Sequence, residues 1–241
     1  MVDFRDQNAI VTGATGGVGH AIAEALVSSG VSLSLVARRR TALDHLIRES
    51  GWPADSVRRF VVDLANESDV KRFAIEIGNR HPDIHLVVHA AGAIILGDIA
   101  ESRLTSFDEQ YQINVRAPYQ LTQALLPNLI RGNGQVVFIN SSAGLNARSG
   151  IAQYAATKHA LRAVADSLRD EVNQHGVRVL SVFLGRTASR MQHAVHEHEQ
   201  RSYHPERLLQ PSDVASIVLS ALSLPRTAEV TDLHIRPMLK S

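Results

Sequence analysis

Residues 8–27 read NAIVTGATGGVGHAIAEALV, and this stretch indicates the fold. Residues 8–12 form a short β-favouring run, residues 13–19 contain four glycines, and residues 20–27 repeat apolar side chains at helical spacing. The pattern predicts a strand, a glycine turn and a helix. Glycines let the backbone bend tightly and approach a ligand, while the free N–H groups at a helix start attract pyrophosphate. A plain strand-to-helix connection would use the same glycines, so the rest of the chain must decide.

A second β-favouring run, residues 32–37, is followed by Arg38, Arg39 and Arg40. In a dinucleotide-binding βαβ unit this position lies beside a ribose of the cofactor. An acidic side chain there accepts bonds from a free 2′-hydroxyl, whereas arginine accommodates a 2′-phosphate. The arginines could instead be a solvated helix start, but positive charge at that end opposes the helix dipole. The sequence therefore favours NADP(H) over NAD(H).

Strands and helices alternate through the remaining chain. Helices are predicted over 41–50, 67–80, 105–131, 152–175 and 211–222, and strands over 58–62, 84–89, 135–140, 177–183 and 229–236. The predicted fold is a single Rossmann domain over residues 1–241, α/β class, with a doubly wound, mostly parallel sheet of about seven strands and helices on both faces. Residues 189–210 lose this periodicity, and we expect an irregular lid over the substrate.

Composition excludes several classes of protein. Hydrophobic residues make up 44% and charged residues 20%, and the net charge of +1 gives no bulk reason to expect nucleic acid or an anionic membrane as partner. No apolar run reaches the roughly 20 residues of a spanning helix, and the first residues have no signal-peptide layout. The chain has no cysteine, so it has no disulfide or thiolate metal site. We expect a cytoplasmic protein.

Candidate catalytic residues follow in the second half of the chain. Tyr154 and Lys158 are four residues apart on a predicted helix and share one face, where the lysine charge would favour the phenolate. Such a pair also arises by chance on many helices. Ser141 follows the strand at 135–140, at the sheet edge where α/β proteins bind ligands. Asn114 lies inside a predicted helix, as a polar relay or as an amide that satisfies a kink.

Two other groups of polar residues were weighed. Asp63 ends a predicted strand, from which its carboxylate could reach an adenine or cap the next helix. His193, His196 and His198 are close together, but no carboxylate or cysteine is spaced to complete a tetrahedral site, so we expect no metal.

Taken in order, these motifs resemble the short-chain dehydrogenase/reductase family, in its compact single-domain branch, over almost the whole chain. The pattern Thr12-Gly13-x-x-x-Gly17-x-Gly19 is similar to the family's cofactor turn. The resemblance implies that Asn114, Ser141, Tyr154 and Lys158 are the catalytic residues, with Ser141 preferred to Ser142 because the family's serine lies thirteen residues before the tyrosine. The implied cofactor contacts are Gly13, Thr15, Gly16, Gly17, Val18, Gly19, Arg38, Arg39, Asp63, Leu64, Ala90, Ala91, Gly92, Tyr154, Lys158, Leu184, Gly185, Thr187 and Ser189.

The resemblance also implies the chemistry. Ser141 and Tyr154 would bond the oxygen of a small carbonyl substrate, Tyr154 would donate the proton, and the reverse reaction would oxidise a secondary alcohol. Lys158 would hold the nicotinamide ribose and favour tyrosinate, while Asn114 would anchor a water. A homodimer or homotetramer is implied, because helices containing Asn114 and Tyr154 pair across a two-fold axis in the family.

Two other functions were considered. A non-catalytic NADP(H)-binding redox sensor on the same fold would have no need of the phenol at Tyr154. A nucleotide-sugar epimerase would need an extra substrate domain, for which 241 residues leave no room.

The chain departs from the family pattern at several positions. Ala90 replaces an asparagine whose amide steadies the central strands, which predicts some loss of stability. Leu184 replaces a proline, and Ser189 replaces a threonine but keeps the hydroxyl. The last residues lack the Asp-Gly-Gly ending of the branch, which puts the usual tetramer contacts in question. Residues 93–96 are expected to line a partly apolar substrate pocket.

Overall fold

A computed structural model describes residues 4–53 and 55–239. Within them one sheet contains seven strands in the order β3-β2-β1-β4-β5-β6-β7, and every neighbouring pair is parallel. The strands are β1 Asn8–Thr12, β2 Ser32–Ala37, β3 Val57–Val61, β4 Leu86–His89, β5 Gln135–Ser141, β6 Arg178–Leu184 and β7 Asp232–Ile235. The α/β Rossmann prediction is confirmed, and the sheet is wholly rather than mostly parallel.

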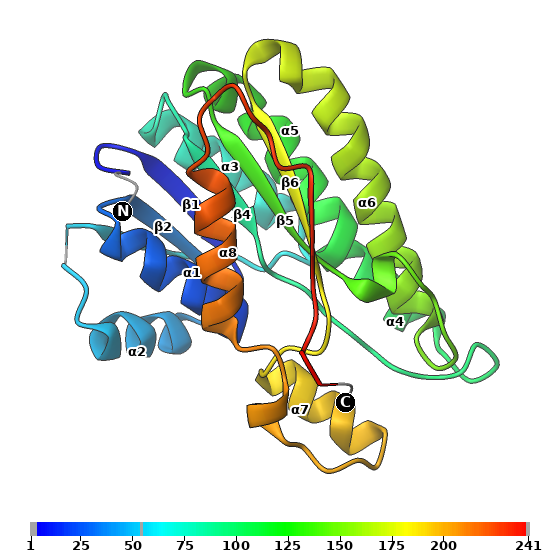
Figure 1. Ribbon diagram of the computed structural model, residues 1–241. Helices are drawn as coiled ribbons and strands as arrows, with labels where there is room; N and C mark the ends of the chain where they lie inside the picture. Colours follow the sequence, from blue (N-terminus) through cyan, green and yellow to red (C-terminus); the bar gives the residue numbers. More distant parts are fainter. Residues whose placement is uncertain (1–3, 54, 240–241) are drawn as a thin grey trace.

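Helices cover both faces of the sheet (Figure 1). One face carries α1 Gly17–Ser28, α2 Arg40–Ser50 and α8 Pro211–Leu222; the other carries α3 Glu67–Arg80, α5 Ala117–Arg131 and α6 Ala152–Val172. A separate cluster of buried apolar side chains lies between the sheet and each layer of helices. Strands buried on both faces need apolar residues at nearly every position, which explains runs such as residues 136–139.

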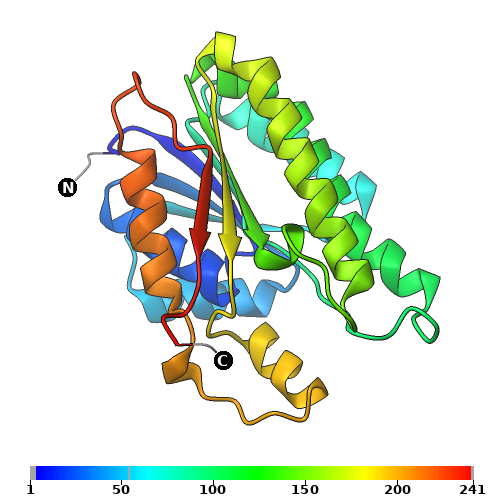
Figure 2. The ribbon, with the colours of Figure 1, turned by 45° about the vertical axis from the view of Figure 1, so that its right-hand side comes forward.

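The strand order reverses beside β1, whose two neighbours are β2 and β4. In open parallel sheets such a reversal leaves a crevice outside the carboxyl ends of the strands, because the helices on its two sides diverge. In Figure 2 the strand arrows point toward α7 Arg190–His198, which lies beyond this edge. The fold therefore brings the ends of β1, β2, β4, β5 and β6 to one place.

The helix predicted over residues 105–131 is divided into three parts. They are α4 Leu104–Tyr111, a π-helical turn at Gln112–Arg116, and α5. Asn114 lies in the π turn, whose wider hydrogen-bonding pattern interrupts the α-helix. Pro118 lies at the start of α5, where a missing N–H costs little, and Pro127 lies inside α5 without ending it.

The segment 189–210 is less irregular than its sequence suggested. It contains α7 and a short 3₁₀ turn at Pro205–Arg207. Ser189 caps α7, since its Oγ accepts a hydrogen bond from the Gln192 N–H at 3.1 Å. Only Val195 and His196 of α7 are buried, so this helix has almost no apolar periodicity to reveal it. Among the described residues, no helix is both long and apolar enough to cross a membrane.

Candidate active site

A cleft of about 940 Å³ opens at the carboxyl ends of the strands. Of the predicted catalytic and cofactor residues, only Asn114 and Arg39 are absent from its lining. Residues from the glycine turn and β2 line one end, and residues from β5 and α6 line the other. The topology therefore collects into one cavity residues that are up to 186 positions apart, from Gly13 to Glu199.

The glycine turn is packed against the end of β4. Gly13 has a φ of 67°, and a Cβ built there would lie 2.6 Å from the Ala91 nitrogen, so only glycine fits. The Ala91 N–H donates to Thr12 Oγ1 at 3.3 Å, which ties the two strand ends together. No side chain caps α1 at Gly16, so the first N–H groups of α1 remain available to an anion in the cleft. This cradle fits a pyrophosphate.

The three arginines after β2 diverge. Arg38 lines the cleft, Arg40 begins α2 and lines a separate groove beside β3, and Arg39 lines neither. All three side chains are exposed, and the first turn of α2 contains no acidic residue to offset them. Of the three arginines, only Arg38 therefore presents its charge to the cleft.

Asp63 lines the cleft just after β3, and its predicted capping role is wrong. The N-cap of α3 is Asn66, whose Oδ1 accepts from the Ser68 and Asp69 N–H groups at 2.9 and 3.2 Å. The Asp63 carboxylate instead accepts from the Ala65 N–H at 3.0 Å and lines the cleft. This bond holds the carboxylate beside the cavity, where ligand contact remains the open interpretation.

Ser141, Tyr154 and Lys158 form a compact group at the other end. Ser141 is the last residue of β5, and its Oγ accepts from the Ala143 N–H at 3.1 Å while also bonding the Tyr154 hydroxyl. The Lys158 Nζ lies 5.9 Å from the centre of the Tyr154 ring and donates to the Ile139 carbonyl at 3.0 Å. The predicted tyrosine–lysine pair is thus a real neighbour pair facing the predicted serine.

Burial dominates the titration of this group. It raises the pKa of Tyr154 above its ordinary value, and the hydrogen bond with the Ser141 hydroxyl opposes that rise. Burial also lowers the pKa of Lys158 to about 8. The sequence suggested that the lysine charge would favour tyrosinate, but in the ligand-free protein desolvation outweighs that attraction. Tyr154 therefore holds its proton at neutral pH and is ready to donate it.

Asn114 lies behind the cleft and is only 1% exposed. Its Oδ1 accepts from the Ala93 N–H at 2.8 Å, and its Nδ2 donates to the Ala93 carbonyl at 2.8 Å and to Thr157 Oγ1 at 3.0 Å. The amide therefore joins the loop after β4 to α6. Both N–H donors are used within the protein, and none of these bonds reaches the backbone of the π turn, so the amide links two other segments rather than satisfying the helix interruption.

Sequence reasoning missed two buried polar residues near the site. Asn140 donates from Nδ2 to the Lys158 carbonyl at 3.1 Å and accepts from the Ser141 N–H at 2.8 Å. Asn140 is only 3% exposed and thus fixes both catalytic segments to each other. Its signal in the sequence is an amide in an otherwise apolar strand, directly before the serine.

The second missed residue is His89, at the end of β4. Its Nε2 bonds Thr122 Oγ1 at 2.8 Å, and its ring stacks on Phe138 with centroids 5.0 Å apart. Complete burial lowers the pKa of His89 to about 3, so the ring is neutral at ordinary pH. The bond to Thr122 joins β4 to α5 directly before Ala90, the position where the expected amide is missing.

The substrate end of the cleft is mixed in character. Of the segment 93–96, Ala93, Ile94 and Leu96 line it and Ile95 does not, and Met191 and Val195 of α7 add further apolar surface. The charged side chains in this lining are Glu109, Arg148, Arg186, Arg190 and Glu199.

An ion pair at this end holds α7 in place. Arg186 Nη2 donates to both carboxylate oxygens of Glu199, at 2.8 and 2.7 Å. Tyr203 adds a second tie, because its hydroxyl accepts from the Ser189 N–H at 3.1 Å. Both ties join a residue just before α7 to a residue just after it.

The neighbouring histidines do not converge on a common point. His196 is buried and bonds the Gln192 carbonyl through Nδ1, whereas His193 is paired with Glu197 at 3.6 Å. Among residues 4–53 and 55–239, no three histidine, aspartate or glutamate side chains are grouped as metal ligands.

Comparison with known proteins places this geometry in context. The family model described as short chain dehydrogenase matches residues 7–200. Uncharacterised oxidoreductases of Staphylococcus epidermidis and Staphylococcus aureus are 28% and 26% identical over 239 residues, which is 99% of this chain and 100% of theirs.

Solved structures agree along the whole chain. A metagenomic short-chain oxidoreductase in complex with NADP has a TM-score of 0.83 and 28% identity, covering 98% of this chain and 99% of that one. An alcohol dehydrogenase from the archaeon Thermococcus sibiricus, complexed with 5-hydroxy-NADP, has a TM-score of 0.85 and 25% identity over 98% of both chains.

Proposed function

This chain belongs to the short-chain dehydrogenase family, an oxidoreductase family, and on that premise we propose that it reduces a carbonyl to a secondary alcohol with NADPH, or runs the reverse reaction. The observation that carries the proposal is the group of Ser141, Tyr154 and Lys158, which lines the same cleft as the glycine turn and Arg38. The two structural relatives named above were both solved with an NADP-type ligand, which supports the choice of cofactor.

When bound, the nicotinamide supplies the hydride, and the protein supplies position and protons. Ser141 and Tyr154 line the same cleft, and in this proposal both hydroxyls donate to one carbonyl oxygen. Donors arranged before reaction stabilise the negative charge that develops on that oxygen. Tyr154 then transfers its proton to the oxygen, which its raised pKa permits because the proton is present at neutral pH.

Lys158 has two roles in this proposal. While it is protonated, its charge stabilises the tyrosinate left after proton transfer, at a distance of 5.9 Å from the ring centre. Its ammonium also lies in the cleft, where it can bond the ribose hydroxyls of the cofactor. The pKa of about 8 places the loss of this charge just above neutral pH.

The remaining residues of the cleft would bind the cofactor and select the substrate. Arg38 would hold the 2′-phosphate, Asp63 the adenine side, and the N-terminus of α1 the pyrophosphate. The segment 189–210 would cover the substrate through α7, whose apolar side chains suit a partly apolar carbonyl compound. Leu104, Tyr111 and Tyr119 are exposed on α4, α5 and their junction, which supports a homodimer or homotetramer through these helices.

A carbonyl panel tests the proposal. Wild type and Tyr154→Phe are assayed for NADPH and NADH oxidation, and binding of NADPH to each is measured by fluorescence. We expect wild type to reduce at least one carbonyl with NADPH preferred, and the variant to lose about a thousandfold in kcat while binding NADPH normally. Undiminished turnover in Tyr154→Phe would exclude this mechanism. Tight NADPH binding without turnover of any carbonyl or alcohol would favour a redox sensor.

A further inference from the structure

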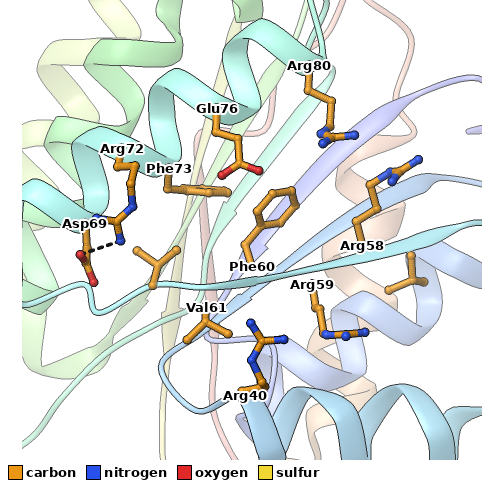
Figure 3. Close-up of a pocket in the computed structure, with 12 residues that line it drawn as sticks. Arg40, Arg58, Arg59, Phe60, Val61, Asp69, Arg72, Phe73, Glu76 and Arg80 are labelled. Carbon is orange, nitrogen blue, oxygen red and sulfur yellow. Dashed lines mark hydrogen bonds and ion pairs between the residues drawn. The ribbon is translucent and has the colours of Figure 1, made fainter.

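The free edge of the sheet carries arginines that the cleft does not use. β3 is the last strand in the sheet order and pairs with β2 alone. A groove of about 480 Å³ follows its outer edge, between α3 and the start of α2 (Figure 3). Five arginines line the groove, namely Arg40, Arg58, Arg59, Arg72 and Arg80. The carboxylates in the lining are Asp69 and Glu76, so positive charge is in excess.

Three of these arginines lack a carboxylate partner. Arg59 Nε lies 2.9 Å from Asp44 Oδ1, and Arg72 Nη2 lies 2.8 Å from Asp69 Oδ1. Within residues 4–53 and 55–239, by contrast, Arg40, Arg58 and Arg80 form no ion pair. The whole chain has a net charge of only +1, so this excess is a local feature.

The pKa of His81, at the end of α3, responds to the positive charge of these arginines. Burial lowers its pKa, and the charges of Arg80 and Arg58 lower it further. Guanidiniums that repel a proton from a neighbouring imidazole would attract a carboxylate by the same field.

The backbone of β3 offers a row of unpaired groups to the same groove. The Leu33 N–H donates to the Ser56 carbonyl at 2.7 Å, and the Val62 N–H donates to the Ala37 carbonyl at 3.1 Å. Because N–H and C=O groups alternate sides along a parallel strand, residues 57, 59 and 61 direct theirs away from β2. An edge of this kind is a template for another strand.

The arginines lie on both faces of the strand edge. Figure 3 shows Arg58 on the α3 side together with Arg80, and Arg59 on the α2 side together with Arg40. A small anion would require guanidiniums that converge on one point. An extended peptide alternates its side chains between two faces, so that carboxylates at successive positions would meet guanidiniums on each.

Apolar surface completes the groove on both sides of the strand. Phe60 and Phe73 line the α3 side, with tilted rings whose centroids are 5.1 Å apart, and Val61 is 39% exposed on the other side. An occupant with apolar residues between its acidic ones would cover this surface.

We infer that the edge of β3 is a docking site for an extended acidic segment of a partner protein, added to the sheet as a further strand. Residues 57, 59 and 61 supply the backbone hydrogen bonds, while Arg40, Arg58 and Arg80 pair with the partner's carboxylates. The groove shares only Val62 with the lining of the cleft, and the inference stands independently of the proposed reaction.

The test uses a fluorescein-labelled heptapeptide in which pairs of glutamates are separated by valines, with binding to the full chain followed by anisotropy. The double variant Arg58→Glu with Arg80→Glu should weaken binding at least about tenfold, equivalent to about 1.4 kcal/mol. The matched control is Lys71→Glu, an exposed cation on α3 that does not line the groove, which should change binding less than about twofold. No binding by wild type, or an equal loss in both variants, overturns the inference.

A second peptide separates strand addition from simple charge attraction. Methylation of alternate backbone nitrogens removes the N–H donors on one edge and should abolish binding to wild type, whether or not the double variant folds. Equal affinity for the methylated peptide would contradict an added strand. Tighter binding of a single-stranded oligonucleotide of equal charge would overturn the inference in favour of a nucleic-acid surface. NADPH binding and thermal unfolding serve as controls for the fold of each variant.

Discussion

The two ends of the cleft use charge in opposite ways. At the catalytic end, Lys158 is buried and Tyr154 is half-buried, and desolvation moves the pKa of each away from its ordinary value. At the ribose end, Arg38 is exposed at the end of β2 and acts through its charge in water. The catalytic end should therefore respond to pH and to small changes in geometry, and the ribose end to salt.

After the loss expected for Tyr154→Phe, the largest effect is expected at Ser141, at the catalytic end. Ser141→Ala should lower kcat about a hundredfold, because one of two donors to the carbonyl oxygen is lost. Ser142→Ala is the matched control, since Ser142 also lines the cleft but is exposed; it should cost less than about threefold. Steady-state kinetics with a substrate from the panel measure both. Equal losses of kcat in the two variants would contradict a specific role for Ser141 as a donor to the carbonyl oxygen.

The buried side chain of His89 should make the free energy of unfolding depend on pH. The unfolded chain binds a proton on this residue below pH 6.5, whereas the folded chain does so only near pH 3. The free energy of unfolding should therefore fall as the pH drops from 6.5 toward 3, by about 1.4 kcal/mol per pH unit within that window. Urea denaturation at several pH values measures the slope.

The control for this prediction is His89→Gln, which keeps a donor for Thr122 and cannot titrate. Other groups that titrate in this window contribute equally to both proteins, so the comparison isolates His89. The variant should show a flatter dependence on pH. An identical slope in both proteins would contradict a neutral, fully buried His89.

At the ribose end, Arg38→Asp should weaken NADPH binding about tenfold and leave NADH binding nearly unchanged. Arg39→Asp carries the same change of charge at a position that does not line the cleft, and should have a much smaller effect. Added salt should reduce the difference between wild type and Arg38→Asp. A wild-type preference for NADH would refute the interpretation of these arginines.

The smallest effect is expected at the segment that covers the substrate. Glu199→Gln removes the charge that pairs with Arg186, and should raise KM a few-fold with little change in kcat. Arg201→Gln is a control at the same carboxylate. Arg201 Nη1 lies 3.7 Å from Glu199 Oε2, and the Arg201 side chain is half exposed. A fall in kcat with KM unchanged would contradict a role confined to holding α7.

Much of this architecture could be predicted from local patterns. The glycine turn, the apolar strands and the helical spacing of Tyr154 and Lys158 are short-range features, and the parallel sheet follows from their alternation. Other features depend on distant contacts. Asn114 bonds Ala93 and Thr157, and Asn140 bonds the carbonyl of Lys158, so neither role is visible in a stretch of sequence.

The departures have similar physical reasons. The helix α7 has few buried residues, so no apolar periodicity predicts it. The direction in which the pKa of Tyr154 shifts depends on the packing around its ring. The divergence of Arg38, Arg39 and Arg40 could not be foreseen either, because it follows from where β2 ends and α2 begins.

The account rests on hydride transfer from NADPH to a carbonyl carbon beside Ser141 and Tyr154. The most direct measurement uses NADPH deuterated at the nicotinamide C4, in both stereochemical forms, with the carbonyl that turns over fastest. Mass spectrometry and NMR of the alcohol should show one deuterium on the carbinol carbon from one of the two forms, and almost no product with Tyr154→Phe. An alcohol without deuterium from either form would contradict the account.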